Sequence, residues 1–238
     1  MQYLTGVYWC RGCEAESNQD ALLLQQVLTY RGRVLLAAVC DGMGGVSQGE
    51  MAGAYVVERL QEWFYKEFLW MLGRKKRIWI IRRSLDRLVW HMQEQMRQYG
   101  RQEEISLGTT MTVLVIWEKA WLLWHLGDSR AYRLRGGRME QLTTDHVHGS
   151  GMLTKCVGSF GSFAPEHGMG VPGTGDGFLL CSDGFRRHIT EDELRDVLLP
   201  AELKGEEQIE RRLREIGEAC MKRGERDNLS AIYVKSYR

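Results

Sequence analysis

The chain has 238 residues, of which 44% are hydrophobic and 26% are charged, and its formal net charge at pH 7 is +1. A chain of this length can bury a substantial core. Only three prolines and no linker-like stretch interrupt it, so we expect one domain over residues 1–238. The balanced charge gives no overall field that would attract nucleic acid or an anionic membrane, and we expect neither as a partner. Because no targeting signal is recognised and no apolar run reaches the roughly 18–20 residues of a spanning helix, we expect a soluble cytoplasmic protein. We also expect a monomer.

The first strand-like run, residues 4–9, is followed by Cys10-Arg11-Gly12-Cys13. Two cysteines at this spacing after a strand are typical of thiol redox sites, in which the first cysteine begins a helix. The next residues are polar and soon become strand-like, so no helix is predicted there. The six cysteines of the chain are expected to be free thiols. A thiol redox protein nevertheless stays open as an alternative function.

The central stretch begins with the apolar run Val34–Val39, which we expect to be a buried strand that forms a hairpin with residues 21–30. It leads into Asp41-Gly42-Met43-Gly44-Gly45. A buried carboxylate is costly unless something pairs with it, and glycines let the backbone approach a ligand closely. Two interpretations are open: an Asp-Gly hairpin turn, or a metal ion bound by Asp41 and a nearby backbone carbonyl.

Two amphipathic helices are expected next. Apolar residues at four-residue spacing predict the first over residues 49–70, and a similar stripe predicts the second over residues 78–99. The outer face of the second helix is rich in arginine. That face could dock a partner or an anionic surface, but a solvated face above a core stripe is the simpler interpretation.

The second half of the chain is dominated by strands. They are predicted over residues 111–117, 120–126, 131–135, 139–142, 178–182 and 229–235. Residues 145–177 are rich in glycine and show no clear pattern. Helices are predicted over residues 191–199, with Thr190 as N-cap, and over residues 206–223. Runs of strands, with helices in adjacent pairs, indicate the α+β class.

An acid beside an apolar run recurs along the chain. Besides Asp41, the acids in such positions are Asp20, Asp128, Asp183 and Asp227. If these strand ends converge, they form a negative cluster of oxygen ligands. Such a cluster suits Mg²⁺ or Mn²⁺ and not a metal that prefers thiolate or imidazole.

Seven short segments give the chain a resemblance to a known family. In order, they are Asn18-Gln19-Asp20, Asp41-Gly42-Met43-Gly44-Gly45, Gly108-Thr109-Thr110, Gly127-Asp128-Ser129-Arg130-Ala131-Tyr132, Leu142-Thr143-Thr144-Asp145-His146, Cys181-Ser182-Asp183-Gly184 and Asp227-Asn228. Together they resemble the metal-dependent serine/threonine protein phosphatases of type 2C, in the bacterial form. The resemblance implies a four-layer α-β-β-α sandwich, with two antiparallel sheets flanked by helix pairs and a metal site at one end.

The resemblance also implies a role for each acid. Asp41 bridges two ions, and the carbonyl of Gly42 is a ligand of one of them. Asp183 and Asp227 hold the other ion, and Asp20 supports the site through metal-bound water. These four carboxylates are the expected catalytic residues.

Further residues are assigned in the same way. Asp128, together with Asp183, matches an acid that holds a third ion. Asn228 is expected to orient Asp227, and Gly108-Thr109-Thr110 to shape the backbone beside the site. The implied cofactor is Mn²⁺ or Mg²⁺, as two ions or three.

The implied reaction is hydrolysis of phosphoserine and phosphothreonine in proteins, the products of a serine/threonine kinase. Two ions lower the pKa of a shared water so that hydroxide attacks phosphorus, and their charge stabilises the oxyanions that develop. No protein nucleophile is required.

Two departures from the family's pattern bear on this function. Ala15 stands where an arginine usually grips the substrate phosphate, and Arg11 or Arg186 could replace it. Met43 stands where some members carry a histidine as general acid.

The region after the Asp-His pair also departs from the pattern. His146 and His148 are interpreted as structural or exposed, and few residues separate them from Gly158, where family members carry a helical flap. The departures motivate a second interpretation: a weakly active or inactive regulatory module that binds phosphoproteins on the same fold.

Overall fold

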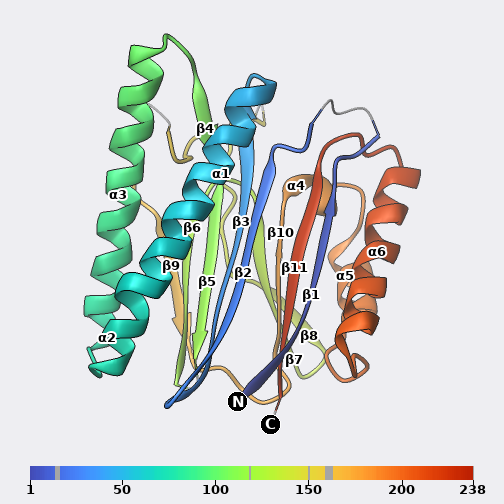
Figure 1. Ribbon diagram of the computed structural model, residues 1–238. Coiled ribbons are helices and arrows are strands. Elements are labelled where there is room, and N and C mark those ends of the chain that lie inside the picture. Colours follow the sequence, from blue (N-terminus) through green and yellow to red (C-terminus); the bar gives the residue numbers. More distant parts are fainter. Residues whose placement is uncertain (14–16, 118, 150, 159–162, 238) are drawn as a thin grey trace.

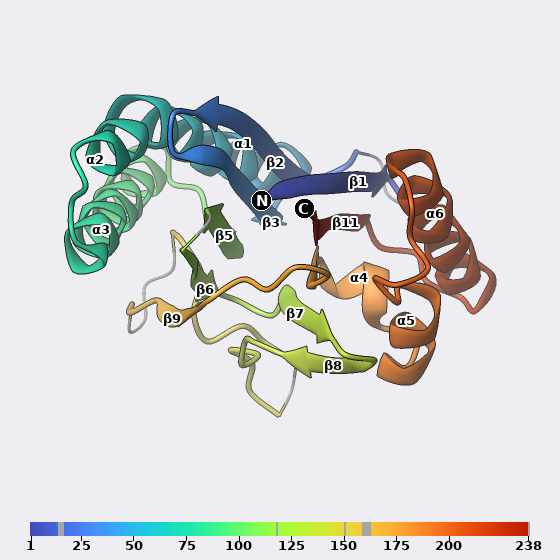
Figure 2. The ribbon, with the colours of Figure 1, turned by 90° about the horizontal axis from the view of Figure 1, so that it is seen from below.

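The computed structural model describes residues 1–13, 17–117, 119–149, 151–158 and 163–237. Figure 1 shows two β-sheets packed between two layers of helices, and Figure 2 shows the same layers from below. The pairings between neighbouring strands of these sheets are antiparallel. The predicted α+β class and four-layer α-β-β-α sandwich are therefore confirmed.

The first sheet joins the two ends of the chain. Its strands, in spatial order, are β1 (Gln2–Cys10), β11 (Leu229–Tyr237), β10 (Gly177–Cys181), β7 (Arg130–Arg135) and β8 (Arg138–Gln141). β1 and β11 pair along their whole length. This register brings residues 11–13 beside the chain that precedes β11, where Asp227 lies.

The second sheet is built around a long central hairpin. Its strands, in spatial order, are β2 (Asp20–Thr29), β3 (Gly32–Gly44), β5 (Met111–Trp117), β6 (Ala120–Leu126) and β9 (Glu166–Gly170), and β4 (Leu107–Thr109) pairs with the end of β3. The run Val34–Cys40 is fully buried, because β3 lies between a helical layer and the other sheet. The same strand then carries Asp41 to the end of the sandwich.

One helical layer covers the second sheet. α1 (Val46–Trp63) continues through a π-helical turn, η1 (Phe64–Phe68), into α2 (Leu69–Gly73), and α3 (Ile78–Gln102) runs beside it. The helix predicted over residues 49–70 is thus correct in position, but it is not uniform. Apolar residues spaced by four drift about 40° per step around an α-helix. The wider π turn corrects this drift, and the rings of Phe64 and Phe68 stack with centroids 5.5 Å apart.

The other helical layer covers the first sheet. It consists of α4 (Asp183–Arg186), α5 (Glu191–Val197) and α6 (Glu206–Lys222). Thr190 caps α5 as predicted, because its hydroxyl accepts from Glu193 N at 3.2 Å while the Glu193 carboxylate accepts from Thr190 N at 2.9 Å. The short helix α4 was not predicted. Within the described residues, no helix combines the length and hydropathy that crossing a bilayer requires.

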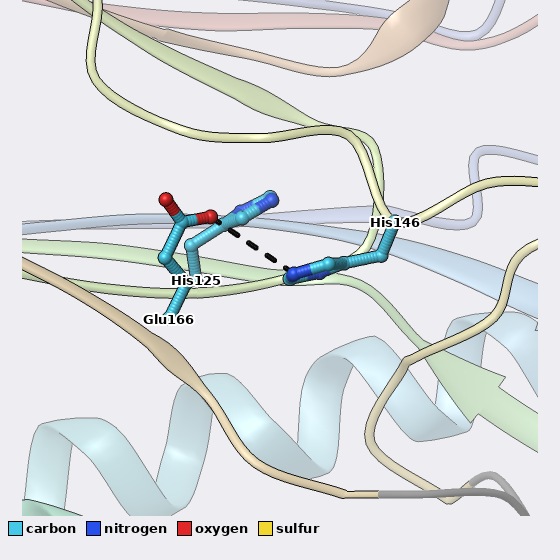
Figure 3. Close-up of side chains that lie close together, drawn as sticks. All are labelled: His125, His146 and Glu166. Atoms are coloured by element: carbon cyan, nitrogen blue, oxygen red, sulfur yellow. Dashed lines mark ion pairs between the residues drawn. The ribbon is translucent and has the colours of Figure 1, made fainter.

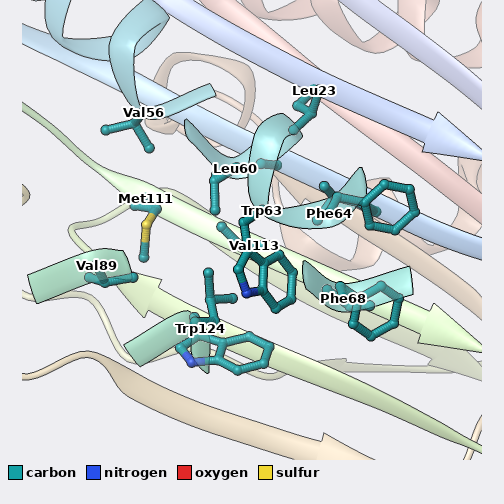
Figure 4. Close-up of a cluster of buried hydrophobic side chains, with 14 of the residues drawn as sticks. Leu23, Val56, Leu60, Trp63, Phe64, Phe68, Val89, Met111, Val113 and Trp124 are labelled. Carbon is teal, nitrogen blue, oxygen red and sulfur yellow. The ribbon is translucent and has the colours of Figure 1, made fainter. Parts of the chain in front are cut away.

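Each pair of adjacent layers buries its own hydrophobic core. Leu60 and Trp124 belong to the core between α1, α3 and the second sheet (Figure 4). Leu213 of α6 packs on the first sheet. Leu35 and Leu36 of β3 point to opposite sides of their strand and so belong to different cores, Leu35 to the one between the sheets.

Strand β9 lies inside the glycine-rich stretch for which no pattern was found. A Cβ on Gly170 would lie 2.7 Å from the indole of Trp121, and one on Gly168 would lie 3.2 Å from it. Glycine weakens strand propensity but lets the backbone pass this close to a large ring. The strand therefore follows from a tertiary contact and not from a local pattern.

Candidate metal centre

The hairpin of β2 and β3 places two acids side by side. Asp20 begins β2 and lies directly opposite Asp41 in the antiparallel register. One more backbone hydrogen bond joins the two chain segments just beyond this pair, where Gly42 N donates to Gln19 O at 3.2 Å. Asp20 is 4% exposed and Asp41 is half-buried. Both carboxylates are therefore shielded from solvent, and they lie side by side where β2 begins and β3 ends.

Two threonines fix the backbone of Asp41. Asp41 N donates to Thr110 Oγ1 at 2.8 Å, and Thr110 N donates to Asp41 O at 2.8 Å. Thr109 Oγ1 donates to the same carbonyl at 3.0 Å. The prediction that this segment shapes the backbone beside the site agrees with these contacts.

The first sheet contributes the remaining acids. Asp183 begins α4 directly after β10, Asp227 precedes β11, and Asp128 lies in the turn between β6 and β7. These three side chains and Asp41 line one cavity of about 740 Å³. Asp20 lies behind this lining, and its proximity raises the pKa of Asp41. The five acids expected to converge do lie at one end of the sandwich.

The crowding of carboxylates changes their protonation. Burial, followed by the charges of Asp227 and Asp183, raises the pKa of Asp20 to about 7, although the nearby Ser230 and Ser182 hydroxyls partly oppose the shift. Burial and Asp20 also raise the pKa of Asp41. Without a compensating cation, the site therefore holds protons more tightly than ordinary carboxylates do.

Asp128 shows the same effect at the other side of the cavity. Burial and the charge of Asp183 raise its pKa to about 6, while Arg186 opposes the shift. The pattern is that of a site built to receive positive charge.

The donor set fits a hard divalent cation. Both carboxylate oxygens of Asp20, and Oδ1 of Asp183, are buried and make no hydrogen bond of good geometry among the described residues. A Cβ on residue 49 would lie 3.0 Å from the carbonyl oxygen of Gly42. Glycine at position 49 therefore leaves space beside that carbonyl. Orphaned carboxylate oxygens next to an open carbonyl are the ligands that Mg²⁺ and Mn²⁺ prefer.

Arg187 is a site residue that the sequence did not reveal. Its Nη2 pairs with Asp183 and lies 3.5 Å from Asp227 Oδ2, while its Nη1 lies 3.0 Å from Glu225 Oε1. Glu225 is almost fully buried and accepts the backbone N–H groups of Arg226 and Asp227 at 2.9 and 3.0 Å. The one local signal is the four-residue spacing from Asp183 to Arg187 at a helix start.

The two arginines suggested by the sequence lie elsewhere. Arg186 Nη2 donates to the carbonyl of Asp128 at 3.0 Å and to Asp145 Oδ2 at 3.1 Å, so it braces the turn that carries Asp128. Arg11 is exposed and is not part of the cavity lining. Ala15 lies outside the described residues.

Asn228 joins three segments of the site. Its backbone N–H donates to Asp227 Oδ1 at 2.8 Å. Its side chain accepts from Gln19 N at 2.8 Å and donates to the carbonyl of Arg11 at 2.6 Å. The expected orientation of Asp227 is therefore provided by the main chain, and the side chain ties the N-terminal segment to the site.

The segment after the Asp-His pair closes one side of the cavity. Gly151, Leu153 and Cys156 contribute to the lining, and Thr109 pairs with Val157 as an isolated bridge. No helix forms between β8 and β9 in the part of this segment that the structure describes. The expected short flap is thus a compact loop.

His125, His146 and Glu166 form a separate cluster (Figure 3), with ligand-type atoms within 4.8 Å of one another. Hydrogen bonds to both ring nitrogens of His125 argue against a metal there. Its Nε2 lies 3.1 Å from the carbonyl of Thr144, which can only accept, and its Nδ1 lies 2.9 Å from the Thr112 hydroxyl. His146 Nδ1 accepts from Gly127 N–H at 3.1 Å, which requires that nitrogen to be unprotonated, and burial lowers the pKa of His125 to about 4, so both rings are neutral near pH 7. His146 therefore supports the turn before Asp128.

The redox interpretation finds no support in the geometry. Cys10 ends strand β1 and Cys13 is exposed, and both are free thiols. The next described element after them is strand β2, which begins at Asp20. A thiol at the end of a strand lacks the helix N-terminus that lowers the pKa of a reactive cysteine.

Comparison with known proteins agrees with this geometry. Residues 14–232 match the family model of protein phosphatase 2C. Protein phosphatase PhpP of Streptococcus pneumoniae is 26% identical over 207 residues, which cover 79% of this chain and 80% of that protein. Serine/threonine phosphatase stp of Listeria welshimeri is 25% identical over 185 residues, which cover 68% and 71%.

Solved structures show the same fold. PppA of Pseudomonas aeruginosa, described as a key regulatory component of T6SS, is 26% identical with a TM-score of 0.82, and the match covers 100% of this chain and 99% of that one. The catalytic domain of the phosphatase PstP, solved with two manganese ions, is 22% identical with a TM-score of 0.79 and 99% coverage of both chains. From the span of the family match, the chain belongs to the protein phosphatase 2C family.

Proposed function

We propose that the protein is a Mn²⁺- or Mg²⁺-dependent phosphatase that hydrolyses phosphoserine and phosphothreonine in proteins, acting in the cytoplasm on the products of a serine/threonine kinase. The observation that carries the proposal is the convergence of carboxylates from five separate segments: four of them line one cavity, and Asp20 is buried behind them. The family is metal-dependent, and the related PstP structure contains manganese.

In this proposal Asp41, the Gly42 carbonyl and the pair Asp183 and Asp227 hold two ions. Asp20 supports them from behind, and Asp128 with Asp183 holds a third ion. Ions bound there would neutralise phosphoryl charge and would lower the pKa of bound water.

The chain's own residues prepare this chemistry. Thr109 and Thr110 fix the backbone of Asp41, so its carboxylate is oriented before an ion or a substrate binds. Arg187 lies outside the cavity lining but pairs with two of its acids, so it is a cation within reach of a substrate phosphate bound there. If Asp183 and Asp227 bound an ion, Nη2 of Arg187 would be released to a phosphoryl oxygen, while Glu225 would keep its hydrogen bond to Nη1.

One observation favours a second function, a regulatory module that binds phosphoproteins without turning them over. Among the described residues that line the cavity, there is no lysine or arginine. That function predicts metal binding with negligible turnover, and a phosphopeptide affinity that Asp128→Asn changes little.

Hydrolysis of a phosphothreonine peptide, with Mn²⁺ and with a chelator, tests the proposal. Turnover is expected only with Mn²⁺, and it should be lost in Asp183→Asn. Asp192→Asn is the matched control, because Asp192 is an exposed acid on α5 that pairs with Arg195. Absence of turnover in a wild type that binds Mn²⁺ would favour the regulatory module. Turnover lost in Cys10→Ser but kept in Asp183→Asn would favour a thiol site.

A further inference from the structure

The end of the molecule opposite the metal centre carries an unusual concentration of positive charge. Between residues 66 and 83, seven side chains are basic and one is acidic, whereas acids outnumber bases in the rest of the chain. The turn between α2 and α3, Arg74-Lys75-Lys76-Arg77, is exposed throughout. In the described part of the chain, no ion pair joins these four side chains to an acid. Their charge is therefore available to a partner.

Large aromatic and apolar side chains surround this turn. Trp70 and Trp79 are 55% and 57% exposed, and Tyr30 and Leu28 at the tip of the β2–β3 hairpin are 77% and 71% exposed. The hairpin tip touches α2 directly, because Tyr30 Oη donates to the carbonyl of Gly73 at 2.6 Å. We call these four residues and Arg74-Lys75-Lys76-Arg77 the basic aromatic end.

The cations and rings of the basic aromatic end are interleaved. The guanidinium of Arg74 lies 5.9 Å from the ring centroid of Trp70, and Lys76 Nζ lies 5.7 Å from it. Indole and phenol rings beside lysine and arginine are the composition that proteins place at the boundary between lipid headgroups and acyl chains.

The backbone of Lys75 gives a second observation. Lys75 has φ +54° directly after the C-terminus of α2, in a left-handed conformation that favours glycine. Its N–H donates to the carbonyl of Leu72 at 3.1 Å, so the strained conformation closes the helix end. A lysine here weakens the fold relative to glycine, which indicates that its exposed side chain serves another purpose.

We propose that the basic aromatic end docks the protein on the surface of an anionic phospholipid bilayer. Two neighbouring tips, a helix turn and a hairpin (Figure 1), carry exposed point charges and rings that can enter the headgroup layer together. A diffuse negative surface matches this arrangement of charge. No membrane partner was expected from the near-zero net charge of the chain, because that sum does not show that basic residues are concentrated at one end of the molecule.

Docking in this way leaves the metal centre free. The helical segment from Val46 to Gly73 starts beside the site loop and runs for about 40 Å at the rise of an α-helix. The basic aromatic end, beside α2, therefore lies at the other end of the molecule from the start of α1 and the metal centre (Figure 1). The proposal is independent of catalysis, because no residue of the basic aromatic end lines the cavity.

Cosedimentation with vesicles tests the proposal. The full chain should bind vesicles that contain phosphatidylglycerol, bind phosphatidylcholine vesicles poorly, and be released at high salt. With a contribution of about 1 kcal/mol for each basic side chain near the surface, Lys75→Gly should weaken binding about five-fold and Lys75→Gln with Lys76→Gln about 30-fold. Trp70→Ala with Trp79→Ala should also weaken it.

Three further variants separate docking from folding and from general charge. Lys75→Gly should keep or raise the melting temperature while it weakens binding, which a purely structural role would not produce. Trp90→Ala and Arg211→Gln with Arg214→Gln are matched controls, because Trp90 is 54% exposed on α3 and both arginines are exposed on α6. Vesicle binding should be unchanged in these controls.

Three results would overturn the proposal. They are no binding to phosphatidylglycerol vesicles at low salt, equal losses in the control variants, and binding to soluble polyglutamate without binding to vesicles. The last result would assign the surface to an acidic protein.

Discussion

The guanidinium of Arg187 forms an ion pair with the carboxylate of Asp183, the acid that begins α4. A protein cation therefore occupies the place between Asp183 and Asp227 that the proposed ion requires. We expect Arg187→Ala to raise the affinity for Mn²⁺ about five- to ten-fold, because it removes a competing positive charge worth about 1 kcal/mol at this range. Isothermal titration calorimetry measures this change.

Arg212→Ala is the matched control for this variant, since Arg212 pairs with Glu215 on α6, away from the site. The Mn²⁺-loaded Arg187→Ala protein should also bind inorganic phosphate about ten-fold more weakly, because a charge-assisted hydrogen bond is lost. An unchanged or lower Mn²⁺ affinity would show that Arg187 does not compete with the ion.

The stability of the metal-free protein should depend on pH through the acid cluster. The pKa of Asp20 is raised to about 7 and that of Asp128 to about 6, both from 3.8. A pKa that is higher in the folded state adds stability below the unfolded value, and this stability is lost as pH rises through the folded value. The melting temperature in a chelator should therefore fall between about pH 4 and pH 7, and saturating Mn²⁺ should remove the fall. A melting temperature that rises over this interval without metal would contradict the assignment.

Neutralising Asp20 should stabilise the metal-free protein while it impairs the metal centre. Asp20 is buried, and its carboxylate oxygens make no good hydrogen bond among the described residues. Asp20→Asn is expected to raise the melting temperature in a chelator above neutral pH by on the order of 5 °C. In Mn²⁺ the gain should disappear, because the variant binds the ion more weakly.

Asp176→Asn gives the contrast for this measurement. Asp176 is equally buried but pairs with Arg133, which is largely buried, and with Arg135, so its neutralisation leaves the Arg133 charge without a partner carboxylate and should destabilise the protein at the same pH. If both variants destabilise the metal-free protein alike, Asp20 is an ordinary structural acid.

Gly49 gives the Gly42 carbonyl group the space it needs beside α1. A Cβ there would lie 3.0 Å from the Gly42 carbonyl oxygen, 2.9 Å from its carbonyl carbon and 2.9 Å from the Gln19 side chain, so Gly49→Ala must displace the backbone beside the site. Alanine is the better helix former by about 1 kcal/mol, which offsets part of this cost to the fold. We expect about ten-fold weaker Mn²⁺ binding from the displaced carbonyl. Gly73→Ala, where no atom lies within 4 Å of the added methyl group, should bind Mn²⁺ normally.

Much of the fold follows from local patterns. The run Val34–Cys40 is apolar at every position because both of its faces are buried, and α6 shows the periodicity of a helix with one buried face. The acids at the strand ends could also be found from a local pattern, an acid beside an apolar run. A carboxylate at the end of a buried strand is costly unless a cation or hydrogen-bond donors compensate its charge. The order of strands and helices predicted the α+β class, and the four-layer sandwich was predicted from the family resemblance that the seven short segments carry.

The features that escaped prediction depend on contacts between distant segments. Strand β9 exists because its glycines pass over Trp121, and the π turn in the first helical segment corrects the drift of its apolar stripe. Arg187 reaches the site because Glu225, 38 residues later in the sequence, holds its guanidinium in place. No local pattern reports such contacts.

The most direct test of the central claim is a calorimetric titration of Mn²⁺ into the metal-free protein near neutral pH. We expect saturable binding of two ions per chain, with proton release from the acids of raised pKa, and loss of that binding in Asp41→Asn. No saturable binding to the wild type, or the same stoichiometry in Asp41→Asn, would contradict a metal centre built on these carboxylates.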